Sequence, residues 1–242
     1  MPGSLKVEGI VLRSMRYGEA DRILHVFTPD RGRLSAIAKG VRKAKSRFGG
    51  RLEPFFRLNL VLYEGRSDLL TVTSAETVHG FRHLREHGAA LNVAARACDA
   101  VDRMFDPGDP HPGVYHLLAN ELALLDADPA AHATQANALA FRLKLLLAAG
   151  FSPQLAACAS CGEREHLSGF SGAAGGVVCS ACEASSFPLS QDAHDFLVAA
   201  LGHPLAETPA APPRALQQAE RAILDTLEYH ANLRLRPVGS DS

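Results

Sequence analysis

The 242-residue sequence contains no hydrophobic run that approaches the ~18 residues a helix needs to cross a lipid bilayer. Its first residues also lack the uninterrupted apolar core of a secretory signal peptide, because Lys6, Glu8 and Arg13 divide the apolar residues there. These two absences exclude an integral helical membrane protein and a secreted one. We therefore expect a soluble, cytoplasmic protein.

The sequence also lacks the short motifs that mark many enzymes. It has no phosphate-binding G-x-x-x-x-G-K-[ST] loop, no G-x-G-x-x-G after a predicted strand, no H-E-x-x-H and no G-x-S-x-G. Its eleven histidines are scattered, and none is paired in sequence with a plausible nucleophile. An active site assembled from distant residues stays possible, but the pattern favours a binding protein that is not an enzyme.

Charge is nearly balanced over the whole chain, at a net −1, but it is unevenly distributed. Residues 1–80 hold 14 Lys and Arg against 8 Asp and Glu, whereas residues 81–242 hold 11 against 18. Regions of opposite charge indicate separate domains with different partners. We therefore predict one domain over residues 1–80 and a second over residues 81–242.

The positive charge of the first region is concentrated in residues 39–54, which we call the basic loop. This segment has six cations and no acid before Glu53, and its glycines, serine and final proline are typical of a loop. Cations this dense repel one another unless they meet an anion, and a nucleic-acid backbone supplies one phosphate per nucleotide. The alternative is a solvated basic loop without a partner. The predicted DNA-binding residues are Arg33, Lys39, Arg42, Lys43, Lys45, Arg47 and Arg51, together with Phe48, which is predicted to stack on an unpaired base.

The residues before Gly80 show the alternation of apolar and polar side chains that is typical of strands. We predict five strands, over residues 5–15, 23–28, 33–39, 54–63 and 68–78. Five short strands fit a small closed barrel, and the OB fold is the five-stranded barrel that binds oligonucleotides. The basic loop falls between the third and fourth strands, at a position suited to ligand binding.

After Gly80 the apolar residues recur at helical spacings of three and four. Helices are expected around residues 91–105, 114–127, 133–149 and 190–201, and again after a Pro- and Ala-rich linker at residues 208–213. Cys98 lies on the apolar stripe of the first helix, so we expect it to be a buried and unreactive core residue. The predicted fold class is α+β, with an OB-fold barrel followed by an α-helical domain.

The other four cysteines form two C-x-x-C pairs, separated by 17 residues: Cys158, Cys161, Cys179 and Cys182. This spacing is typical of four-cysteine zinc sites, and the glycine- and serine-rich segment between the pairs has few residues able to build a core. We expect one structural zinc ion per chain, in a module over residues 155–187 that is inserted in the helical domain. Redox use of one pair is the alternative.

Several stretches resemble the RecO family of bacterial recombinational-repair proteins. They are Ala38-Lys39-Gly40-Val41-Arg42, Lys45-Ser46, Gly50-Arg51-Leu52-Glu53-Pro54-Phe55, and Phe141-Arg142-Leu143-Lys144-Leu145-Leu146 with Gly150-Phe151. The resemblance implies an N-terminal OB domain, a helical C-terminal domain and, in many members, a zinc module. It further implies that the protein binds single- and double-stranded DNA at the nucleoid and anneals complementary strands. In that family RecR and single-stranded-DNA-binding protein are partners in loading the recombinase, and no covalent reaction is catalysed.

Two other classes of function stay open on the sequence. A zinc-ribbon nucleic-acid enzyme such as a nuclease would need a carboxylate cluster for magnesium, and the acids of residues 1–80 are too dispersed to suggest one. A protein-interaction scaffold would instead use the basic loop to bind an acidic peptide. Competition between single-stranded DNA and such a peptide distinguishes the scaffold from a DNA-repair mediator.

Overall fold

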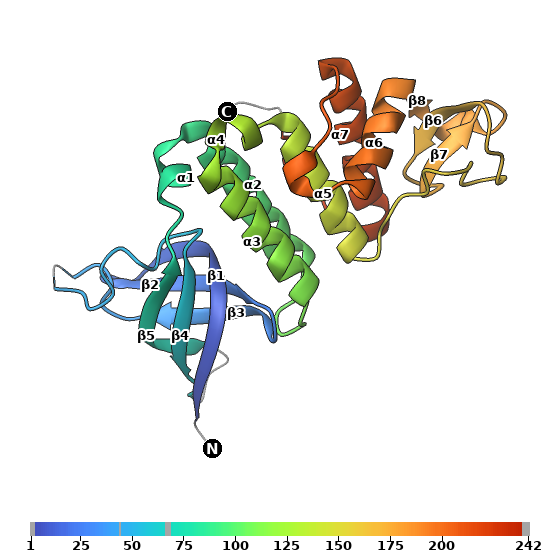
Figure 1. Ribbon diagram of the computed structural model, residues 1–242. Helices are drawn as coiled ribbons and strands as arrows, with labels where there is room; N and C mark the ends of the chain where they lie inside the picture. The colour runs from blue at the N-terminus through green and yellow to red at the C-terminus, as the bar shows by residue number, and fades with distance from the viewer. Residues whose placement is uncertain (1–2, 44, 66–68, 239–242) are drawn as a thin grey trace. The chain divides into compact units, whose positions relative to one another are not determined.

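A computed structural model describes residues 3–43, 45–65 and 69–238 (Figure 1). The chain forms two compact units, residues 1–129 and residues 130–242. The last barrel strand ends close to residue 80, and the unit that contains the barrel continues through three helices to Pro129. Within the described residues, no helix is both long enough and apolar enough to span a membrane.

The first unit begins with a closed five-stranded barrel whose strands follow the order β1-β2-β3-β5-β4. β1 pairs with both β2 and β4 and so closes the barrel, while β3 and β5 run parallel. This is the predicted OB fold, and all five predicted strands are present. Their bounds are β1 (Ser4–Tyr17), β2 (Asp21–Thr28), β3 (Gly32–Ala38), β4 (Arg57–Tyr63) and β5 (Leu70–His79). Asp68, where the fifth strand was predicted to begin, lies outside the described residues.

β4 begins three residues later than predicted, at Arg57 instead of Pro54. Phe55 has a φ of 78°, in the left-handed region that bulky residues rarely adopt, and this interrupts an extended strand. The backbone at Phe55 still pairs with β1, because the Phe55 N–H donates to the Val11 carbonyl at 2.8 Å and the Val11 N–H donates to Phe56 at 2.9 Å. The chain therefore enters β4 through a kink that is held by β1.

Alternating side chains of the strands fill the barrel interior. In β4, Leu58, Leu60 and Leu62 point inward and are almost completely buried, as the alternation predicts. They pack with residues of the other strands and with two residues of the basic loop. The buried members of this core are Val11, Leu24, Val26, Ala36, Ala38, Phe48, Leu52, Leu58, Leu60, Leu62, Leu70 and Val72.

Three helices complete the first unit: α1 (Arg82–Glu86), α2 (Gly88–Met104) and α3 (Pro112–Ala127). α2 and α3 follow the apolar periodicity of the sequence, and Pro112 lies at the start of α3, where its missing N–H costs no helical hydrogen bond. Cys98 is 1% exposed on the inner side of α2, as predicted, and burial raises the pKa of its thiol.

The second unit contains three long helices, α5 (Gln135–Ala148), α6 (Gln191–Gly202) and α7 (Pro213–Ala231). Thr134 and Ser190 cap α5 and α6, since each side-chain oxygen accepts a hydrogen bond from a backbone N–H in the first turn. The short α4 (Pro129–His132) lies at the junction of the two units. A short helical turn, η2 (Leu205–Glu207), follows α6.

Between α5 and α6 the chain forms a three-stranded sheet in the order β7-β6-β8, which the sequence did not predict. A hydrogen bond of 3.0 Å from the Gly172 N–H to Asp225 Oδ2 joins this sheet to α7, and Arg221 lies over the Phe187 ring at 4.1 Å. The elements are β6 (Leu167–Ser171), β7 (Gly176–Cys179), η1 (Glu183–Ser185) and β8 (Phe187–Pro188).

Candidate metal centre and nucleic-acid interface

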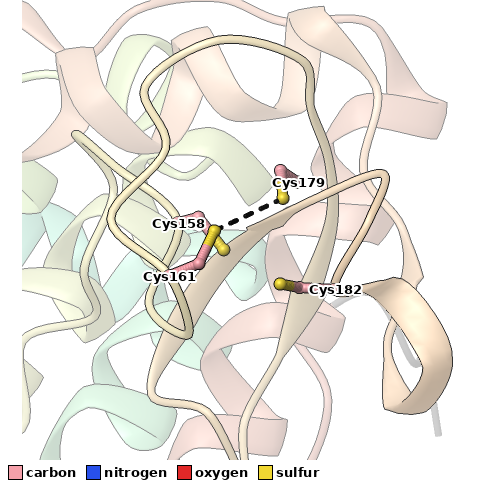
Figure 2. Close-up of side chains that lie close together, drawn as sticks. All are labelled: Cys158, Cys161, Cys179 and Cys182. Atoms are coloured by element: carbon pink, nitrogen blue, oxygen red, sulfur yellow. Dashed lines mark hydrogen bonds between the residues drawn. The ribbon is translucent and has the colours of Figure 1, made fainter.

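The sulfur atoms of Cys158, Cys161, Cys179 and Cys182 all lie within 4.8 Å of one another. Figure 2 shows the four side chains converging from two turns. The sulfur atoms of Cys161 and Cys179 are 3.7 Å apart, and tetrahedral zinc with bonds of ~2.3 Å holds its sulfur ligands ~3.8 Å apart. The four predicted ligands therefore come together with the spacing of a tetrahedral thiolate site.

Each C-x-x-C pair lies on a tight turn that aims its two thiols the same way. In the first turn, the Gly162 N–H donates to the Cys158 carbonyl at 2.8 Å, and Gly162 has a φ of 80° that favours glycine. In the second, Cys179 ends β7 and its carbonyl accepts from the Cys182 N–H at 2.9 Å. The short sheet thus brings one turn next to the other.

The electrostatics of the cluster favour a bound cation. Backbone hydrogen bonds, the first of them from Cys179, lower the pKa of Cys158 to about 6 and so favour its thiolate. Side-chain hydrogen bonding, first with Cys161 and then with Cys179, raises the pKa of Cys182 to about 12 because it stabilises the protonated thiol, and the nearby Cys158 thiolate adds repulsion in the same direction. A divalent metal removes that repulsion and allows all four thiols to ionise. Among the described residues, these cysteines are the one group of three or more potential ligands placed close enough to share an ion.

The basic loop is fixed at both ends to the hairpin formed by β1 and β2. At its start, the Gly40 N–H donates to Asp21 Oδ1 at 2.8 Å, and the Arg42 N–H donates to the Ala20 carbonyl at 3.0 Å. At its end, Glu53 forms an ion pair of 3.1 Å with Arg22. Glu53, the first acid after the run of cations, is therefore paired with a residue of the barrel.

Phe48 lies inside the barrel core, contrary to the prediction that it stacks on an unpaired base. Its side chain is 2% exposed, and the Arg47 guanidinium lies over the ring, 4.8 Å from its centre. Leu52, at 1% exposed, enters the same core from the loop. A ring covered in this way cannot offer its face to a base, so Phe48 is an anchor of the loop.

Arg33 also has a partner within the protein. Its guanidinium lies 3.3 Å from Asp102 Oδ1, and that nearly buried carboxylate is also 2.7 Å from His25 Nδ1 and 3.6 Å from Arg13 Nη1. Because Asp102 lies in α2, this cluster connects the outer surface of the barrel to a helix. The Arg33 side chain, which the sequence assigned to DNA, is therefore engaged within the protein through a carboxylate that it shares with Arg13.

The other six predicted cations differ in how much their side chains are engaged. Arg51 donates to the carbonyls of Phe48 at 2.9 Å and Arg47 at 3.2 Å, so it stabilises the loop's own shape. The Arg47 guanidinium lies over the Phe48 ring. The other four side chains are exposed and form no hydrogen bond or ion pair with any other described residue: Lys39, Arg42, Lys43 and Lys45. These four are the cations most available to an external anion.

Comparison with known proteins gives a consistent result over almost the whole chain. The family model described as Recombination protein O N terminal matches residues 1–81, and the one described as Recombination protein O C terminal matches residues 85–237. The chain belongs to the RecO family. It is similar to the DNA repair protein RecO of Rubrobacter xylanophilus, with 40% identity covering 89% of this chain and 87% of the relative.

Further RecO relatives agree with this result. The DNA repair protein RecO of Anaeromyxobacter sp. strain K is 36% identical, with 96% of this chain and 93% of the relative covered. That of Bifidobacterium longum strain DJO10A is 38% identical over 72% of each chain. The resemblance first seen in the basic loop therefore extends through both units, and the family is one of DNA repair proteins.

Two features of this RecO barrel were not predicted from its sequence. Asp102 is 69 residues from Arg33, and nothing in the local pattern indicates that they meet. Tyr17 is 53% exposed at the end of β1, beside the turn to which the basic loop is hydrogen-bonded. An aromatic residue immediately before Gly18 is a weak signal of such exposure, because it places the ring at the tip of a hairpin.

Proposed function

We propose that the protein is a non-enzymatic mediator of DNA repair and homologous recombination. It binds single- and double-stranded DNA, anneals complementary strands and acts with RecR and single-stranded-DNA-binding protein to load the recombinase. The observation that carries the DNA-binding step is the group of four exposed cations, Lys39, Arg42, Lys43 and Lys45, on a loop fixed to an OB barrel.

The proposed mechanism is electrostatic. The four cations bind phosphates of the DNA backbone, and the released counterions supply much of the binding free energy. Bound cations also reduce the repulsion between two approaching strands, which lets complementary bases find each other. Arg47 and Arg51 lie at the same loop and are expected to add weaker phosphate contacts. Since phosphates carry no base information, binding should depend little on DNA sequence.

We further propose that the four cysteines hold one zinc ion, which has a structural role. The sulfur spacing and the tight turns fit tetrahedral zinc, and four protein ligands leave no position for water or substrate. When bound, the ion supplies the cross-link that holds the turns of Cys158 and Cys179 together. Redox chemistry needs only one C-x-x-C pair, so it does not account for the second pair.

The acidic second region is the proposed receiver of protein partners. Residues 81–242 carry 18 acids against 11 Lys and Arg, so they repel DNA and suit basic or apolar protein surfaces. In this proposal the barrel binds DNA phosphates and the helical region binds partner proteins. We also propose that the protein acts in the cytoplasm, at the nucleoid.

A strand-annealing assay without nucleotide and without magnesium tests the proposal. Wild-type protein should accelerate the annealing of complementary oligonucleotides, and the Arg42→Ala/Lys45→Ala variant should do so much more slowly. The control Lys6→Ala/Arg214→Ala removes two exposed cations outside the loop and should retain activity. Absence of annealing by folded wild-type protein contradicts the proposal. Displacement of single-stranded DNA by an acidic peptide at lower concentration than by DNA itself would favour the scaffold.

A further inference from the structure

Tyr17 is the last residue of β1 and is one of the most exposed large hydrophobic residues that the structure describes, at 53%. A single exposed ring is common on protein surfaces, so a function for Tyr17 has to be argued from the residues around it.

The residues next to Tyr17 form an apolar ledge on the outer face of the hairpin. Met15 lies on the same face of β1, two residues earlier, and is 37% exposed. Across the hairpin, Met15 pairs with Ile23, which is half-buried, and Tyr17 pairs with Asp21. A flat aromatic group placed on this ledge contacts the Tyr17 ring and has the Met15 side chain beside it.

The basic loop begins directly beside this ledge. Asp21, the cross-strand partner of Tyr17, accepts the hydrogen bond of the Gly40 N–H at 2.8 Å, so its carboxylate is engaged by the loop. The Arg42 N–H donates to Ala20, within the turn between Tyr17 and Asp21. The exposed ring of Tyr17 therefore lies beside the turn to which the cation-rich loop is hydrogen-bonded.

From this arrangement we infer that Tyr17 stacks on an unpaired base of single-stranded DNA whose phosphates contact the basic loop. The inference rests on the proposed function and names a second chemical group that the same site recognises. A stacking aromatic residue beside backbone-binding cations is the usual composition of a single-strand site. Bases inside a duplex already stack on their neighbours, so Tyr17 contributes to single-strand binding and not to duplex binding. It takes the role that the sequence analysis gave to Phe48.

Fluorescence measures the stacking directly, because the sequence contains no tryptophan. Tyr17→Trp introduces a single tryptophan at the ledge, and titration with oligothymidine should quench its emission in parallel with binding measured by anisotropy. Tyr63→Trp is the matched control, since Tyr63 is 44% exposed at the end of β4 and receives no hydrogen bond from the described residues of the basic loop. Its emission should change little. Equal quenching of the two variants, or none at Tyr17→Trp during binding, overturns the inference.

Affinity measurements complete the test. Tyr17→Ala should weaken binding of oligothymidine by roughly five- to 150-fold, the range for one stacked base, without changing the salt dependence. Tyr17→Phe and Tyr63→Ala should bind as wild type does, and a blunt duplex should bind every variant equally well. An equal loss for single strand and duplex, or no loss, refutes stacking at Tyr17 even if Arg42→Ala/Lys45→Ala weakens binding. Failure of wild-type protein to bind DNA would instead remove the proposed function itself.

Discussion

The basic loop (39–54) and the cysteine module (155–187) both contain tight turns and several glycines, yet they are held in place by different means. The loop inserts Phe48 and Leu52 into a core that the barrel strands already provide. In the module, the cysteines are themselves part of the packing: Cys158 and Cys179 are buried against Val178, next to a sheet that buries Phe170, Val177 and Phe187. With four thiols in its structure, the module should depend on a metal that joins them.

This difference decides which part of each segment remains available for function. Because two apolar anchors fix the loop, its cations are left exposed and need no partner for folding. In the module, the chemically reactive groups are themselves the anchors, and a metal would occupy all four. The basic loop therefore keeps its charged side chains exposed for binding, whereas the cysteine module uses its thiols to hold its own structure.

The largest effect should follow removal of a cysteine ligand. Purified wild-type protein should contain close to one zinc per chain, and Cys158→Ser should lose it and unfold residues 155–187, because structural zinc contributes an apparent ~10–16 kcal/mol in small zinc domains. Metal analysis and hydrogen exchange measure both outcomes. Cys98→Ala removes a thiol outside the cluster and should keep the metal. Wild-type protein that contains no metal under reducing conditions contradicts the account.

Lowering the pH should destabilise the cysteine module before it affects the basic loop. Metal ligation requires thiolates, so protons compete with zinc as the pH falls, and the module should release its ion and lose protection from hydrogen exchange. The burial of Phe48 and Leu52 involves no titratable group, so this central part of the basic loop should stay docked at the pH at which zinc is released, even if the contacts of its ends with Asp21 and through Glu53 weaken. A zinc indicator and amide exchange of both segments provide the measurement. Simultaneous loss of both segments would show that their stabilities are coupled.

Phe48→Ala should have the next largest effect. Removing a completely buried phenylalanine typically costs about 3–5 kcal/mol, and here it should free the basic loop and destabilise the barrel. Chemical denaturation and exchange rates of barrel amides check this expectation. Phe48→Leu retains most of the buried volume and should cost much less. A barrel of unchanged stability in Phe48→Ala would mean that the loop is not anchored through this ring.

The sequence predicted the regular parts of the molecule because their causes are local. The alternation of apolar residues in strands and their spacing of three and four in helices can be read without tertiary information. The C-x-x-C spacing likewise indicates a shared ligand. Phe48 lacks such a signal, because Arg47 and Gly49 surround it with loop chemistry and the space it fills exists only in the closed barrel. Two further features have no local signal. The ion pair between Arg33 and Asp102 joins residues far apart in sequence, and the sheet that includes Leu167–Ser171 is made of very short strands.

Salt dependence of single-strand affinity tests most directly the claim that the exposed cations of the basic loop bind phosphates. For oligothymidine, the slope of log affinity against log salt should be less steep in Arg42→Ala/Lys45→Ala than in wild type by about 1.4, or ~0.7 per lost phosphate contact. The control Lys6→Ala/Arg214→Ala should keep the wild-type slope. A folded loop variant with the affinity and slope of wild type would show that the phosphates are bound elsewhere on the protein.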